Sequence, residues 1–247
     1  MSTMLNAIVG TVTACGAASL AGLHTMAPWS QLYGANFQGL APGTKQLALT
    51  YDDGPNDPYT QQLLEVLAKH GAVATFFLIG RYVKQRPEIV REIVAAGHTV
   101  GNHTWDHPLL IFCSAAETRR QISSTQMAIE DACGVSSALF RPPFGGRRPG
   151  TFAVVHALDL TPVMWNVTCY DWSATSNDCI EAKARRQIHG GDVVLLHDGG
   201  HKRFGTDRQW TVKATENLLR EYGDKGYEFV SVAEMVDTGS ELPVASF

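Results

Sequence analysis

The chain has 247 residues and a formal net charge of −4 at pH 7, and 45% of its residues are hydrophobic. A chain of this length forms one large domain or two small ones, and the composition is that of a globular protein, not a disordered one. The mild acidity argues against nucleic acid as a partner, because binding phosphate groups needs a basic surface.

The beginning of the chain is apolar. Residues 5–23 contain no charged side chain, and as a helix they would measure about 30 Å, enough to span the hydrocarbon of a bilayer. Small residues are as frequent there as leucine or valine, and no lysine or arginine precedes the segment. The alternative is a non-native or poorly ordered leader. We favour an export or membrane-anchoring segment, and therefore a secreted or cell-envelope protein over a cytoplasmic one.

From residue 46 onward, strand-like and helix-like segments alternate. In chain order we predict strand 46–51, helix 59–70, strand 73–79, helix 87–96, strand 98–101, helix 115–133, strand 138–141, helix 150–158, strand 162–167, helix 178–189, strand 192–196, helix 211–222 and strand 227–232. Apolar strands that alternate with helices indicate an α/β fold with a parallel sheet covered on both faces. We place this domain at residues 44–237, after a leader and linker at 1–43 and before a C-terminal tail at 238–247.

Residues capable of chemistry follow the C-terminal ends of five predicted strands. They are Asp52 and Asp53, His103 and His107, Arg141, Asp171, and His197. In a parallel barrel these strand ends form one rim, which is where the active site is built. We therefore expect these side chains to share one site.

Two histidines and a carboxylate in this set indicate a metal site. His103 and His107 are four positions apart, and Gly101 before them and Pro108 after them favour a loop or a single turn over a helix. With Asp53 they supply three protein ligands, the arrangement of a hydrolytic metal site that keeps open positions. Taken alone, the histidines are equally a surface pair without a role, and the aspartates an acidic turn.

Five short motifs resemble those of the NodB-type polysaccharide deacetylases, carbohydrate esterase family 4. In family order they are residues 50–55 (TYDDGP), 103–108 (HTWDHP), 141–145 (RPPFG), 171–172 (DW) and 195–197 (LLH). The resemblance implies an irregular parallel (β/α) barrel of about seven strands, the TIM-barrel-like NodB homology domain. It also implies a metal-dependent hydrolase that removes acetyl groups from an N-acetylated or O-acetylated polysaccharide or oligosaccharide.

The resemblance also implies a role for each matching residue. Asp53, His103 and His107 would bind a divalent metal, most often zinc in such enzymes, although two imidazoles and a carboxylate also accept cobalt, nickel or iron. Asp52 would be the general base, and Arg141 would pair with it and orient it.

The remaining roles concern the acid and the substrate. His197 would be the general acid, with Asp171 raising its proton affinity. Trp172 and Leu195 would form the small apolar pocket for the acetyl methyl group. The backbone N–H of Phe144 would face the developing oxyanion.

Two alternatives stay open at this stage. A related amidase or deformylase, acting on a small cyclic amide or a sugar lipid, would share the same catalytic residues. An inactive domain that binds carbohydrate or metal would need neither Asp52 nor His197. On the family's pattern we favour material containing N-acetylglucosamine as the substrate, and we expect a monomer.

Some aromatic and basic residues remain without a role. Trp105, Trp165 and Trp210 are candidates for stacking on sugar rings, although Trp165 lies on a predicted strand and is expected in the core. Residues 147–148 and 201–203 are basic and flank the predicted rim, where they either contact an anionic or sugar substrate or form a solvated surface.

Overall fold

The structure, a computed structural model, describes residues 21–241. The predicted apolar segment at 5–23 lies outside this range apart from its last three residues, and so do residues 242–247 of the predicted tail. Among the helices of the described range, none combines the length and the apolar character needed to cross a bilayer.

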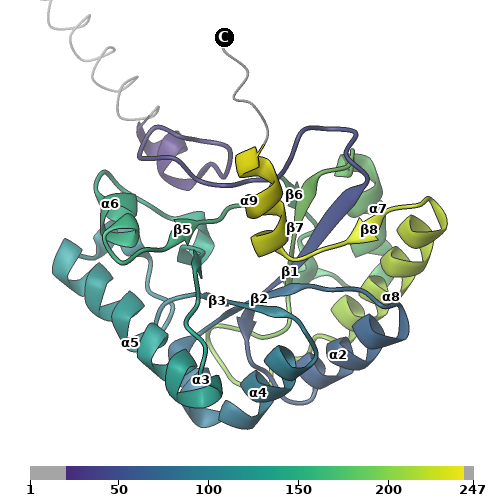
Figure 1. The fold of residues 1–247 in the computed structure, drawn as a ribbon, viewed down its shortest axis with the longest axis horizontal. Coiled ribbons are helices and arrows are strands. Elements are labelled where there is room, and N and C mark those ends of the chain that lie inside the picture. The colour runs from purple at the N-terminus through teal and green to yellow at the C-terminus, as the bar shows by residue number, and fades with distance from the viewer. Residues whose placement is uncertain (1–20, 242–247) are drawn as a thin grey trace, which may run out of the picture.

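Seven parallel strands form one sheet that curls into an incomplete barrel (Figure 1). They are β1 (Gln46–Gly54), β2 (Thr75–Leu78), β3 (Thr99–Asn102), β4 (Leu139–Phe140), β5 (Thr161–Pro162), β6 (Val167–Thr168) and β7 (Asp192–His197), in the spatial order β5-β4-β3-β2-β1-β7-β6. An eighth strand, β8 (Glu228–Phe229), pairs with the first two residues of β1. The predicted parallel barrel-like fold is confirmed.

Most helices lie around the outer side of the sheet, and the last one packs on the interior of the barrel (Figure 1). They are α2 (Tyr59–Lys69), α3 (Gly80–Gln85), α4 (Pro87–Ala95), α5 (Ala115–Cys133), α6 (Thr151–His156), α7 (Asn177–Gln187), α8 (Gln209–Asp224) and α9 (Val232–Glu241). Helix α3, which was not predicted, directly follows the short strand β2, and the strand predicted at 73–79 is longer than the observed one. Helix α9 occupies residues where we predicted the end of the domain and the start of a tail.

The alternation of side chains along β1 separates two cores. Leu47, Leu49 and Tyr51 pack toward the helices, whereas Ala48 belongs to a second cluster inside the barrel. That inner cluster includes Met235 of α9, which is fully buried. An even-numbered position at the C-terminal end of β1 therefore faces the barrel interior, which is where a site on the rim has to begin.

The strand predicted at 162–167 is wrong, because this segment belongs to two strands at opposite edges of the sheet. Strands β5 and β6 are the two edge strands of the curled sheet, and the residues between them cross from one edge to the other. Val163 forms a bridge with Phe37, and the Asn166 N–H donates to the oxygen of Val193. Met164 and Trp165 are buried in this crossing, so the run is as apolar as a strand without being one.

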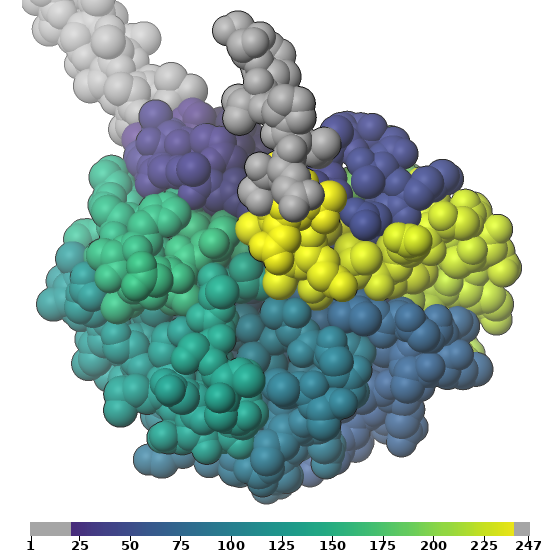
Figure 2. Space-filling view, in the orientation of Figure 1, coloured from purple at the N-terminus to yellow at the C-terminus, as the bar shows by residue number. Residues whose placement is uncertain are grey.

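The segment before β1 packs on the barrel and is not a free linker. The Phe37 N–H donates to Pro162 O and the Leu40 N–H to Gly191 O, at 2.8 and 2.7 Å. Figure 2 shows this segment, in purple, lying against α6, where Gly34 approaches the Phe152 side chain. The limits of 44 and 237 stay predictions, and residues on both sides of them pack on the barrel.

Candidate active site

The two consecutive aspartates at the end of β1 both face the site. Successive side chains of a regular strand point to opposite faces, so Asp53 would ordinarily point away from Asp52. The pairing of β1 with β2 shifts register between Asp52 and Gly54, and Asp53 has a left-handed φ of 73°. This bulge brings the two carboxylates together, with His103 Nε2 lying 3.7 Å from an oxygen of each.

His103 and His107 lie in the turn that follows β3, as predicted, and not on a helix. Thr104 and His107 have left-handed φ values of 69° and 63°, which a right-handed helix does not contain. The Nδ1 atom of His103 lies 2.7 Å from the backbone oxygen of Arg141. A carbonyl can only accept, so His103 Nδ1 carries the proton and His103 Nε2 is left as a ligand atom.

Asp53, His103 and His107 form a buried group of three ligand atoms that lie within 4.8 Å of one another. Asp53 Oδ1 is 3.3 Å from His107 Nε2, and within residues 21–241 it has no hydrogen-bond partner. A buried carboxylate oxygen without a partner costs free energy unless a ligand satisfies it. Two imidazole nitrogens and one carboxylate oxygen suit zinc and similar ions, so the residues present fit a divalent cation.

Arg141 is fully buried behind Asp52. Its Nη1 donates to Asp52 Oδ1 at 2.8 Å and to Thr50 Oγ1 at 2.7 Å, and its Nη2 donates to Met164 O at 3.1 Å. Burial lowers the pKa of Arg141 and the charge of Asp52 opposes this, but a guanidinium keeps its charge in proteins. These contacts fix one Asp52 oxygen and turn the other toward His103.

His197, the last residue of β7, is held by Asp171. The Nδ1–H of His197 donates to Asp171 Oδ1 at 2.8 Å. The other oxygen of Asp171 accepts the backbone N–H of His197 and the hydroxyl of Thr211, each at 2.8 Å. Both oxygens of this carboxylate are therefore occupied, and the ring is oriented so that Nε2 remains for exchange with a substrate.

The pKa values of two histidines of the site, His107 and His197, are shifted in opposite directions. Burial lowers the pKa of His107 to about 2, because desolvation outweighs the attraction of Asp53, and this ring is neutral and able to act as a ligand. Burial also disfavours the charged form of His197, but the charge of Asp171 and the hydrogen bond to it raise the pKa of His197 to about 9. His197 therefore carries a proton at neutral pH.

These residues meet at a cavity of about 590 Å³. Its lining combines ligand candidates, the acid candidate and apolar side chains, namely Asp53, His103, His107, His197, Phe144, Trp165, Trp172 and Leu195. Asp52, Arg141 and Asp171 lie behind this surface, each less than 5% exposed. The Trp172 ring contacts the His197 ring edge-on at 5.2 Å between centroids, which places an apolar wall beside the acid. All ten predicted site residues are thus brought together.

A family model described as Polysaccharide deacetylase matches residues 40–163. A chitooligosaccharide deacetylase of Sinorhizobium fredii is 37% identical over 191 residues, which cover 75% of this chain and 89% of the relative. The chain belongs to the polysaccharide deacetylase family. A peptidoglycan-N-acetylglucosamine deacetylase of Bacillus cereus is 33% identical over 223 residues, covering 89% of this chain and 78% of that protein.

Solved structures agree with this family. A CE4 family pseudoenzyme from Bacillus anthracis superposes with a TM-score of 0.76 at 30% identity, covering 82% of this chain and 69% of that one. The resemblance read from the five motifs is confirmed, and so are the barrel-like fold and the prediction of a metal-dependent deacetylase.

The polysaccharide deacetylase site contains one histidine that the motifs did not predict. The ring of His201 stacks on the ring of His107, with 4.5 Å between centroids, and its backbone N–H donates to Asp53 Oδ2 at 3.1 Å. Burial raises the pKa of Asp53, but the His201 side chain, with Nδ1 3.6 Å from Asp53 Oδ2, and the neighbouring imidazoles outweigh burial and lower that pKa. The sequence placed residue 201 in a basic group that flanks the rim, but it gave no sign that this ring lies against His107.

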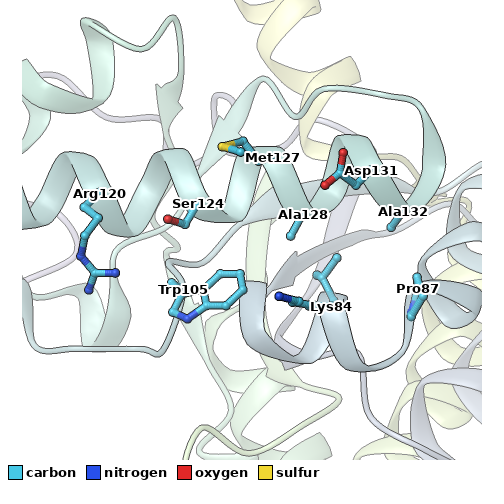
Figure 3. Close-up of a pocket in the computed structure, with 10 residues that line it drawn as sticks. Lys84, Pro87, Trp105, Arg120, Ser124, Met127, Ala128, Asp131 and Ala132 are labelled. Carbon is cyan, nitrogen blue, oxygen red and sulfur yellow. The ribbon is translucent and has the colours of Figure 1, made fainter.

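Two residues near the motifs lie away from the site. Trp105 faces a separate cavity of about 580 Å³ between α3 and α5, and Figure 3 shows its ring pointing toward α5 beside Ser124. It is therefore not available to stack on a sugar in the active site. Arg147 is fully buried and donates to the backbone oxygens of Ala27 and Ser30, so it holds the segment before β1 and is not part of a basic rim.

Proposed function

We propose that this polysaccharide deacetylase hydrolyses the acetamido group of N-acetylglucosamine units in an oligosaccharide or polysaccharide, with Asp53, His103 and His107 holding a divalent cation, zinc in our proposal. The observation that carries the proposal is the convergence of this ligand set and a protonated His197 on one cavity, where Asp53 Oδ1 has no hydrogen-bond partner among residues 21–241. A cation bound there supplies Lewis acidity, which acidifies water and polarises the acetyl carbonyl.

Asp52 acts as the general base in this proposal. Its Oδ1 is engaged by Arg141, while its Oδ2 lies 3.7 Å from His103 Nε2, on the side of the ligand set. A carboxylate held in this way takes the proton from an attacking water without having to reorient. Arg141 positions Asp52 and does not touch the reacting atoms.

His197 acts as the general acid. An amine is a poor leaving group, so amide cleavage needs a proton delivered to nitrogen, and His197 carries one at neutral pH. Trp172 and Leu195 line the cavity next to His197 and suit the acetyl methyl group. The backbone N–H of Phe144, a residue with a left-handed φ of 58°, is the donor we assign to the oxyanion.

The alternatives are less well supported. A domain that only binds carbohydrate needs no base and no acid, yet Asp52 is held by Arg141 and His197 by Asp171. The Bacillus anthracis neighbour is named a pseudoenzyme, so the fold by itself does not secure catalysis. The presence of the base, the acid and the ligand set favours an active enzyme here. The relatives' names, chitooligosaccharide and peptidoglycan deacetylase, favour an N-acetylated sugar over a small cyclic amide.

The test is acetate release from N-acetylglucosamine oligomers by the purified protein. We expect acetate from the zinc-loaded protein, loss of release after treatment with a chelator, and recovery when zinc is returned. Formate release from formylated sugars without acetate release would support the deformylase alternative. Binding of the oligomers by folded, zinc-loaded protein without any acetate would contradict the proposal and support a binding domain.

A further inference from the structure

One wall of the active-site cavity is basic. The segment after β7 contributes Lys202, Arg203 and Arg208 to the lining, whereas Asp53 is the one carboxylate among the lining residues and belongs to the ligand set. The protein as a whole is acidic, with a formal net charge of −4. Three permanent cations on one side of a single cavity therefore create a local positive field that the overall composition does not predict.

Two of these cations have no carboxylate partner in the described part of the chain. Lys202 and Arg203 are exposed and form no ion pair within residues 21–241. Arg208 donates from Nε to Gly199 O at 2.7 Å and from Nη1 to Asp207 O at 3.4 Å, so its hydrogen bonds go to backbone oxygens, while its charge also lowers the pKa of Asp171 and Asp207. Elsewhere on the surface, cations such as those of α2, α5, α7 and α8 pair with glutamates. The charges of Lys202 and Arg203 are thus fully available to a ligand.

The backbone that carries these cations is held in place. The side chain of buried Asn56 donates to the backbone oxygens of Asp198 and Thr206, at 2.7 and 2.9 Å, and accepts the Gly205 N–H at 2.8 Å. The Thr206 hydroxyl donates to Arg203 O at 2.7 Å. A segment fixed at both ends presents its charges to a ligand with less loss of conformational entropy than a free loop.

The nearest acid of the segment, Asp207, attracts Arg208 but is hydrogen-bonded outside the cavity. Asp207 accepts the backbone N–H and the side-chain amide of Gln209, each at 2.9 Å, at the start of α8. It is exposed and is not among the residues that line the cavity.

We propose that the substrate of this deacetylase is an acidic sugar chain, in which a unit beside the deacetylated amino sugar places a carboxylate against Lys202, Arg203 and Arg208. This inference rests on the proposed function. A neutral N-acetylglucosamine chain offers only hydroxyl and amide groups to the wall, whereas a carboxylate accepts paired hydrogen bonds from a guanidinium and is attracted by all three charges.

Matched substrates test the inference. One is an oligomer of N-acetylated amino sugars in which alternate units carry a lactyl carboxylate, and the other is the same oligomer with each carboxylate converted to a methylamide. We expect kcat/KM of the native enzyme to be about tenfold higher for the acidic oligomer at low salt, mainly through KM, because each exposed ion pair contributes only a few-fold. Raising the ionic strength should shrink the preference, since salt screens exposed charges.

Two double variants with the same change in net charge locate the effect. Lys202→Gln with Arg203→Gln should abolish most of the preference for the acidic oligomer. Arg119→Gln with Arg186→Gln, at exposed positions on α5 and α7, should retain it. Equal kcat/KM for the two oligomers in the native enzyme would overturn the inference, and so would an equal loss of preference in both double variants.

A failure of the proposed function can be distinguished from a failure of the inference about the acidic substrate. If zinc-loaded native enzyme released acetate from neither oligomer, the deacetylase proposal itself would be contradicted. If it released acetate from both at equal rates, only the inference about the acidic substrate would fall.

Discussion

The two sides of the active site use the same pair, a histidine beside an aspartate, for different purposes. On one side His107 Nε2 lies 3.3 Å from Asp53, and on the other His197 Nδ1 lies 2.8 Å from Asp171. Burial disfavours the charged form of both rings, yet the pKa of His107 falls to about 2 and that of His197 rises to about 9. Burial alone therefore does not decide which histidine holds a proton.

The difference lies in how each carboxylate is occupied. Both oxygens of Asp171 accept hydrogen bonds, two from His197 and one from Thr211, so its charge is directed at that one ring. Asp53 has one oxygen bonded to the His201 N–H and one without a partner within residues 21–241. A carboxylate whose oxygens are both hydrogen-bonded raises the pKa of the histidine it contacts. A buried carboxylate oxygen without a hydrogen bond is suited to binding a cation.

Removing a side chain of the proposed metal site should have the largest effect on acetate release. His103→Ala removes one of three ligands, so we expect the protein to lose its bound metal and essentially all acetate release. Metal analysis of the purified variant measures this directly. His156→Ala, which truncates an exposed histidine on α6, is the matched control and should keep both metal and activity. An unchanged metal content in the His103 variant would remove His103 from the ligand set.

The next largest effect on kcat is expected for Asp52, and a variant of its neighbour Asp53 distinguishes the roles of the two aspartates. Asp52→Asn keeps the shape and the contact with Arg141 but removes the proton acceptor, so kcat should fall by about 10²- to 10⁴-fold while the metal stays bound. Asp53→Asn is the counterpart, and it should lose metal. Since His103 Nε2 is 3.7 Å from both carboxylates, the pair of variants decides which is the ligand. Metal loss in the Asp52 variant as well would contradict the division of roles.

A smaller effect on kcat is expected from changing Asp171, the partner of the proposed general acid His197. Asp171 holds the pKa of His197 up at about 9, so kcat should be retained below that value and decline as pH rises through it. In Asp171→Asn the carboxylate charge is gone while burial, which lowers the pKa, remains. The alkaline limb of the pH–rate profile should therefore move to lower pH, with kcat at neutral pH reduced by about tenfold. Asp224→Asn, at an exposed position, should leave the profile in place.

Much of this site was predictable because parallel strands carry their C-terminal ends to one rim. Asp52, His103 and His197 all follow apolar strand runs, and ordered motifs around them identified the family. The strand alternation rule, by contrast, places Asp53 on the wrong face. Only the bulge between β1 and β2 brings Asp53 beside Asp52, and a register shift of this kind has no signature in a single sequence.

Other features depended on packing between distant segments. Thr211 lies 40 residues from Asp171, and its hydroxyl is one of many on helices, so its hydrogen bond could not be foreseen. Residues 163–165 of the crossing are apolar because they are buried between the two edges of the sheet, and a short buried apolar run cannot be told from a strand in the sequence alone. Trp105 lies between His103 and His107 in sequence, yet its ring points toward α5 (Figure 3).

The smallest expected effect concerns the support that Asp53 receives. The His201 ring stacks on His107 and its Nδ1 lies 3.6 Å from Asp53 Oδ2, but the hydrogen bond to that oxygen comes from the His201 backbone, which His201→Ala retains. We therefore expect the metal dissociation constant, measured by competition with a chelator, to rise by about tenfold or less. Complete loss of metal, as expected for His103→Ala, would make His201 a fourth ligand. An unchanged constant would mean that the backbone N–H alone supports Asp53, and that the metal side, unlike the acid side, has no side chain dedicated to its carboxylate.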